Sequence, residues 1–203
     1  MDVLLNDFRH QLFKLLNAAT GMSETGVSTA REIAKKLENG NANYHNAGAL
    51  NPLGDVLESL KPDTVTSNQD CAQLLSALTA ISDALPWYKR SAPGVPDFEE
   101  GHVNAEILGP KGLEIREDIL VGVSLMRPEL TYPDHHHPPE EVYVVLSEGL
   151  WRQNDAPWWS PGVGGYVYNP PDILHAMKSV ETPLCAIWCL SLENTTNNFS
   201  LAS

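Results

Sequence analysis

The chain has 203 residues, of which 13 are Lys or Arg and 26 are Asp or Glu, and its formal net charge is −13. Such an acidic chain lacks the basic surface that binding to nucleic acid or to an anionic membrane requires. No stretch approaches the roughly 20 apolar residues of a membrane span, and the first residues lack the basic flank of a signal peptide, so we expect a cytoplasmic protein.

The first part of the sequence is patterned for helices. Apolar residues recur at three- and four-residue steps over residues 3–16, which predicts an amphipathic helix. A second helix is expected over about residues 29–37, where Thr29 and Glu32 stand at the spacing of a capping box. A third is expected over about residues 67–85.

From residue 102 the pattern changes to strands. Short runs of β-branched and apolar residues alternate with turn clusters, which is typical of an antiparallel sandwich or barrel. The expected strands are 103–108, 115–126, 141–146, 149–152, 165–168 and 184–192. We therefore predict an α+β, mainly β fold, with a jelly-roll β-barrel over residues 101–203 and an N-terminal helical extension over residues 1–100 that packs on it.

Residues that bind metals concentrate between Thr131 and Gly149. His135 and His137 are separated by one residue, and Glu141 follows four positions later. A strand points residues i and i+2 to the same face, so these donors can converge. His175 supplies another imidazole from a later segment. A site of two imidazoles and one carboxylate with open positions is typical of catalysis rather than of structure.

His137, Glu141 and His175 are thus the expected ligands of one divalent transition metal ion per chain. The donor types suit zinc, ferrous iron, manganese, nickel or cobalt and do not choose among them. His135 is either a fourth ligand or a group that faces the substrate.

Tyr143 lies two residues after Glu141, so in a strand both side chains point to the same face. A nearby divalent cation favours the phenolate, which would make Tyr143 a general base near neutral pH. Tyrosine is also an ordinary strand residue, and the sequence leaves that alternative open.

The two histidine segments resemble the paired motifs of the cupin superfamily, G-x5-H-x-H-x3-E-x6-G and G-x5-P-x-G-x2-H-x3-N. The run from His135 to Glu141 matches the first motif, and Gly164, Pro170 and His175 match the second. The turn residues differ from both motifs, while the metal-binding residues are kept.

A more specific resemblance rests on the run 132–143, followed by Trp151-Arg152 and by residues 158–162. These segments resemble the cupin lyases that cleave dimethylsulfoniopropionate (DMSP), specifically the DddQ type. The resemblance implies a β-elimination that converts this small sulfonium zwitterion into dimethyl sulfide and acrylate.

The resemblance also implies roles for individual residues. His137, Glu141 and His175 correspond to the metal ligands of these lyases. Tyr143 corresponds to the base that removes the proton next to the carboxylate, and to a metal ligand when substrate is absent. Tyr132 and His135 correspond to further active-site residues that line the substrate pocket.

A sulfonium group needs an aromatic face, because a cation over a ring is stabilised by about 0.5 to 2 kcal/mol. The candidates for such a wall are Tyr132, Tyr166, Tyr168, Trp151 and Trp188. Of these, Tyr132, Tyr166 and Trp188 are predicted with His135 to line the substrate pocket. The glycine-rich loop over residues 158–165 is either a mobile lid or a rigid aromatic plug.

Two alternatives remain at this point. Another metal-dependent cupin enzyme, such as an iron dioxygenase or a sugar isomerase, would use the same ligands with a different pocket. A non-catalytic binding module would use the helical extension as a surface for its partner. We expect a monomer or a homodimer in either case.

Overall fold

The computed structural model describes residues 2–41, 43–45, 48–61, 68–92 and 95–192. Its helices are α1 (Asp2–Asn17), α2 (Glu24–Leu37), α3 (Gly54–Ser59), α5 (Gln69–Ile81), the 3-10 helix η1 (Ser82–Ala84) and α6 (Pro96–Gly101). Its strands are β1 (Trp87–Tyr88), β2 (His102–Gly109), β3 (Glu114–Ile115), β4 (Ile119–Met126), β5 (Thr131–His135), β6 (Glu141–Val145), β7 (Leu150–Gln153), β8 (Tyr166–Asn169), β9 (His175–Lys178) and β10 (Leu184–Ser191).

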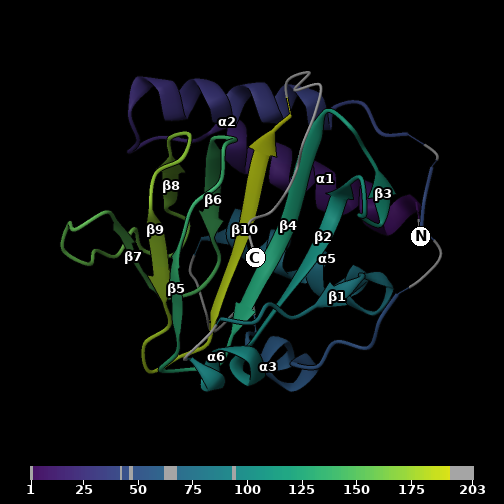
Figure 1. Ribbon diagram of the computed structural model, residues 1–203. Helices are drawn as coiled ribbons and strands as arrows, with labels where there is room; N and C mark the ends of the chain where they lie inside the picture. The colour runs from purple at the N-terminus through teal and green to yellow at the C-terminus, as the bar shows by residue number, and fades with distance from the viewer. Residues whose placement is uncertain (1, 42, 46–47, 62–67, 93–94, 193–203) are drawn as a thin grey trace.

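The strands form two sheets. The larger has the order β1-β2-β4-β10-β6-β8 with β3 added to β2, and the smaller has the order β5-β9-β7. All strand pairs are antiparallel except β2 with β3. Helices α1, α2 and α5 cover one face of the larger sheet (Figure 1). The predicted α+β, mainly β antiparallel architecture is confirmed.

Alternation along the strands separates two apolar cores. On β10, Cys185 and Ile187 belong to the core shared with the helices, whereas Ala186 and Trp188 belong to a second core. The second core joins residues of both sheets, such as Tyr143 of β6 and Trp151 of β7, and so fills the barrel interior. Strand β10 of the larger sheet therefore has one face toward the helices and one toward the interior.

The boundary predicted at residue 100 stays a prediction, because the helices and the larger sheet share one buried core. Strand β1 also lies before that boundary and pairs with β2. No helix among the described residues is long and apolar enough to cross a membrane.

The predicted capping box at Thr29 is wrong. Helix α2 begins at Glu24, and the hydroxyl oxygen of Ser23 caps it by accepting from the Gly26 N–H at 3.1 Å. Thr29 instead lies buried inside the helix, where its hydroxyl lies 2.9 Å from the Thr25 carbonyl oxygen and 3.0 Å from a carboxylate oxygen of Glu140. The threonine thus connects α2 to the start of β6 rather than starting a helix.

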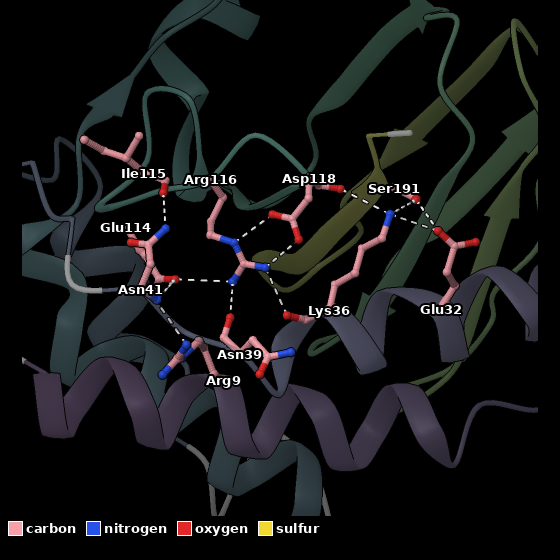
Figure 2. A network of polar contacts seen from close by, with 10 residues as sticks. All are labelled: Arg9, Glu32, Lys36, Asn39, Asn41, Glu114, Ile115, Arg116, Asp118 and Ser191. Carbon is pink, nitrogen blue, oxygen red and sulfur yellow. Dashed lines mark hydrogen bonds and ion pairs between the residues drawn. The ribbon is translucent and has the colours of Figure 1, made fainter. Parts of the chain in front are cut away.

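The predicted run 115–126 is divided by charged residues. Arg116 and Asp118 separate β3 from β4 and form part of a polar network between the helices and the barrel (Figure 2). The Arg116 guanidinium donates to both Asp118 oxygens at 2.7 Å and to the Asn39 and Lys36 carbonyls at 2.6 and 3.0 Å. It also lies 3.3 Å from the fully buried carboxylate of Glu114.

Replacing Arg116 with Ala is expected to lower the free energy of unfolding by about 3 kcal/mol, because it removes the closer of the two cations that pair with the buried Glu114 carboxylate and leaves only Arg9, at 3.6 Å. Chemical denaturation followed by circular dichroism measures this loss. Arg127→Ala is the control, since Arg127 is exposed and pairs with the exposed Asp55 at 3.5 Å; it should cost less than about 1 kcal/mol. Equal losses for the two variants would contradict the structural role given to Arg116.

Candidate functional site

Three side chains from separate elements converge in the barrel. His137 precedes β6, Glu141 begins β6, and His175 begins β9. One candidate ligand atom from each lies within 4.8 Å of the other two. The Glu141 Oε2 atom lies 3.5 Å from Nε2 of His137 and 3.4 Å from Nε2 of His175. Glu141 and His175 are almost fully buried.

Backbone carbonyls fix the protonation of both imidazoles. Nδ1 of His137 lies 2.8 Å from the Pro139 oxygen, and Nδ1 of His175 lies 2.9 Å from the Ile173 oxygen. A carbonyl only accepts, so each Nδ1 carries a proton, and in the neutral ring each Nε2 then presents its lone pair toward Glu141. The buried Nε2 of His175 has no hydrogen-bond partner among the described residues. Two lone pairs aimed at a carboxylate need a cation between them, so these residues fit a metal ion.

His135 lies beside this group but outside it. Its ring centroid is 4.1 Å from that of His175 and 6.4 Å from that of His137. Its Nδ1 donates to the Pro133 carbonyl at 3.0 Å. Burial, assisted by His175, lowers the pKa of His135 to about 3, so its imidazole is neutral. The geometry favours the second role expected for His135, a neighbour of the three ligands rather than a fourth one.

Asn169, which the sequence did not single out, orients the carboxylate. It lies opposite Glu141 in the β6–β8 pair, and its Nδ2 donates to Glu141 Oε2 at 2.8 Å. Its Oδ1 accepts from Gln153 Nε2 at 2.8 Å, which fixes the direction of the amide. Gln153 lies on β7, so this relay connects the two sheets at the carboxylate. The contact between Asn169 and Glu141 follows from the pairing of β6 with β8, which the sequence alone does not give.

Replacing Asn169 with Ala is expected to weaken metal binding by about 10- to 100-fold, the usual effect of losing a group that orients a ligand. Competition with a chromogenic chelator measures the affinity. Gln153→Ala should have a smaller effect, since Asn169 keeps its bond to Glu141. Asn17→Ala, at the exposed end of α1, is the control. Unchanged affinity in the folded Asn169 variant would rule out this orienting role.

Tyr143 shares the interior face with Glu141, in agreement with the alternation along β6. It pairs with Trp188 on β10, and both side chains belong to the interior core. A Cβ at Gly122 of β4 would lie 2.1 Å from the Trp188 ring, so glycine there lets the indole lie over the strand. Burial, followed by the Glu141 charge, raises the pKa of Tyr143 well above 10.

Tyr132 also reaches the interior core. Its ring meets Phe98 edge-on at 4.7 Å and lies 4.7 Å from the His135 ring. Burial raises the pKa of the Tyr132 phenol to about 12. The structure therefore brings together the predicted base, Tyr143, and three residues predicted to line the substrate pocket, namely Tyr132, His135 and Trp188.

The structure does not bring Tyr166 to this site. On β8, Val167 pairs with Tyr143 and faces the interior, so Tyr166 and Tyr168 face the helices. The Tyr166 hydroxyl donates to the Leu15 carbonyl of α1 at 2.7 Å, and that of Tyr168 donates to Glu140 at 2.7 Å. The pocket role predicted for Tyr166 is wrong, because the register between β6 and β8 turns its side chain toward the helices.

The loop over residues 158–165 is held at several points. Two cations lie over the Trp158 ring, the guanidinium of Arg152 at 5.0 Å from its centroid and the Lys178 amine at 4.6 Å. Trp159 exchanges two backbone hydrogen bonds with Trp151, at 2.8 and 3.0 Å. The Gly164 N–H donates to the Val145 carbonyl at 2.8 Å. These contacts favour a rigid loop over a mobile lid.

Comparisons with known proteins agree with this geometry. The chain is 28% identical over 111 residues to a putative DMSP lyase DddL from Cereibacter sphaeroides, a match that covers 55% of this chain and 47% of that relative. It is 28% identical over 140 residues to the DMSP lyase DddQ from Ruegeria pomeroyi, covering 67% of this chain and 68% of DddQ. The chain thus spans about half the length of the DddL relative.

Two solved structures share the fold. A chain from crystal structures of the DMSP lyases RdDddP and RnDddQII superposes with a TM-score of 0.72 at 20% identity, covering 97% of this chain and 96% of that one. The crystal structure of DddQ from Ruegeria pomeroyi DSS-3 superposes with a TM-score of 0.64 at 22% identity, covering 92% and 94%. The family model for DMSP lyases matches residues 26–186, most of the chain and all three convergent residues. The protein therefore belongs to the DMSP lyase family.

Proposed function

We propose that the protein is a metal-dependent lyase that cleaves DMSP by β-elimination into dimethyl sulfide and acrylate. The observation that carries this proposal is the arrangement around Glu141. Two imidazole lone pairs point at its carboxylate from within 3.5 Å, and the phenol of Tyr143 lies on the same strand face. Membership of the DMSP lyase family supports the choice of substrate.

His137 Nε2, Glu141 Oε2 and His175 Nε2 would hold the metal. When bound, the ion supplies a positive charge that neutralises the substrate carboxylate and so makes the neighbouring C–H bond more acidic. Zinc, ferrous iron, manganese, nickel and cobalt all suit two imidazoles and one carboxylate.

Tyr143 is the proposed base. The positive charge of a bound metal would offset the effects of burial and of Glu141 on the Tyr143 pKa and so favour the phenolate. The phenolate oxygen takes the proton from the carbon next to the carboxylate, and the released electron pair forms the carbon–carbon double bond. The pair of the carbon–sulfur bond leaves with sulfur, which changes from a sulfonium to neutral dimethyl sulfide. The leaving group needs no acid, and Tyr143 afterwards gives its proton to water.

The aromatic side chains of the interior core are suited to the sulfonium end of the substrate. Tyr132, Trp151 and Trp188 belong to that core and are each at most 8% exposed. A ring face close to the sulfonium contributes about 0.5–2 kcal/mol. Unlike a nucleophilic side chain, it does not attack the carbons bonded to the sulfonium sulfur. His135, neutral and next to Tyr132, lines the same side.

Incubating the purified protein with DMSP and each of the five metals tests the proposal. Dimethyl sulfide by gas chromatography and acrylate by liquid chromatography should appear in equal amounts. Oxygen consumption would indicate a cupin dioxygenase instead. Absence of turnover with every metal would indicate a binding module.

A further inference from the structure

A second group of polar side chains faces the barrel interior from strands that carry no metal-binding residue. Asn104 of β2 pairs with Ser124 of β4, and Ser124 in turn pairs with Ala186 of the interior core. His102 lies on the same face of β2, and Arg90 lies just after β1. None of these residues has a part in the site described above.

His102 fixes the position of Arg90. The ring is fully buried and stacks on Phe98 at 3.7 Å, with Tyr132 edge-on at 5.5 Å. Its Nδ1 donates to the Phe98 carbonyl, and its Nε2 accepts the backbone N–H of Arg90 at 3.0 Å. Burial lowers the pKa of His102 to about 4, so this neutral tautomer is kept. The segment that carries Arg90 is therefore held next to Tyr132.

The Arg90 guanidinium is half-buried and close enough to the tyrosines of the site to interact with them electrostatically. It bonds to the Tyr88 hydroxyl and interacts electrostatically with Tyr132, Tyr143 and His135. Among the described residues, no Asp or Glu forms an ion pair with it. A partly buried guanidinium next to phenols, with no anion of its own, is a site prepared for an anionic ligand.

Asn104 adds a second unused donor. Only 3% of the residue is exposed. Its Oδ1 accepts from the Ser124 hydroxyl at 2.6 Å, which turns Nδ2 to the other side. Nδ2 has no acceptor at full hydrogen-bond geometry and lies beside the Tyr132 hydroxyl. A buried amide donor without an acceptor is costly unless a ligand supplies one.

We propose that Arg90 binds the carboxylate of the substrate, with Asn104 as an additional donor beside it, and that Arg90 thereby selects anionic substrates. This inference rests on the proposed function and adds a residue from the N-terminal segment to the substrate site. The planar guanidinium matches a carboxylate with two parallel hydrogen bonds. It also repels a sulfonium, so it sets the direction in which the zwitterion enters.

Calorimetric titration of the zinc-loaded protein with propanoate and with propanamide tests the inference without turnover. Arg90→Gln should weaken propanoate binding by about 10- to 100-fold and leave propanamide binding unchanged. Arg90→Lys, which keeps the charge but not the planar fork, should fall between the two. Lys89→Gln removes the neighbouring charge, which pairs with Glu100 at 3.0 Å on the surface, and should bind like the wild type.

Each variant is also checked for zinc content and thermal unfolding. Arg90→Gln or Arg90→Lys protein that is folded, holds zinc and binds propanoate as tightly as the wild type would overturn the inference. Wild-type protein that prefers propanoate no more than propanamide would overturn it as well.

A kinetic measurement separates this inference from the proposed function. With DMSP as substrate, Arg90→Gln should raise KM by the factor seen in the titration and change kcat much less. If the wild type does not cleave DMSP at all, the proposed function fails, while the titration still decides the role of Arg90.

Discussion

Replacing Tyr143 with Phe is expected to lower kcat for DMSP cleavage by about 100- to 10,000-fold, the usual contribution of a general base. The substitution removes one oxygen and keeps the ring that meets Trp151 edge-on at 6.1 Å. Because the packed ring is kept, the unfolding temperature should stay close to that of the wild type. Acrylate release under saturating DMSP measures the effect.

Tyr166→Phe is the matched control for this experiment. It removes the same atom from a neighbouring strand, but from the face toward the helices, where the hydroxyl donates to the Leu15 carbonyl. We expect a loss of about 1 kcal/mol in stability and little change in kcat. A Tyr143→Phe enzyme that retains most of its activity would exclude the phenol as base and favour another reaction at the metal, such as oxygen activation.

Replacing His137 with Ala is expected to remove the metal and, with it, DMSP cleavage. The loss of activity should exceed about 100-fold, because even residues that only orient a ligand contribute 10- to 100-fold. Metal content by mass spectrometry and acrylate release are measured on the same samples. Chelation should inactivate the wild type in the same way, and added metal should restore the wild type but not the variant.

His136→Ala provides the control within the same histidine run. The His136 side chain is 58% exposed and lies 3.7 Å from the exposed carboxylate of Asp172, away from the three convergent residues. This variant should bind metal and cleave DMSP like the wild type. Loss of metal from His136→Ala, with retention in His137→Ala, would contradict the assignment of the ligands.

Much of the site could be predicted because its residues lie close in sequence or within one regular strand. His137 and Glu141 flank a short turn into β6, and Tyr143 follows in unbroken alternation with Glu141. His175 was found from its glycine–proline–histidine segment. These inferences needed only the local geometry of a strand and the donor preferences of metals.

The remaining residues depend on contacts between distant segments. The direction in which Tyr166 points is set by the register between β6 and β8, across a loop where alternation cannot be counted. Asn169 meets Glu141 through that same register. Arg90 reaches the site because β1 pairs with β2 and His102 holds the backbone beyond it. None of these three contacts leaves a pattern in the sequence.

Diffraction from crystals of the metal-loaded protein, with data collected at the absorption edge of the metal, tests the central claim most directly. The account predicts one anomalous peak bonded to Nε2 of His137, Oε2 of Glu141 and Nε2 of His175, with the Tyr143 hydroxyl next to it. A peak held by other residues, or a metal-loaded site from which Tyr143 is turned away, would contradict it.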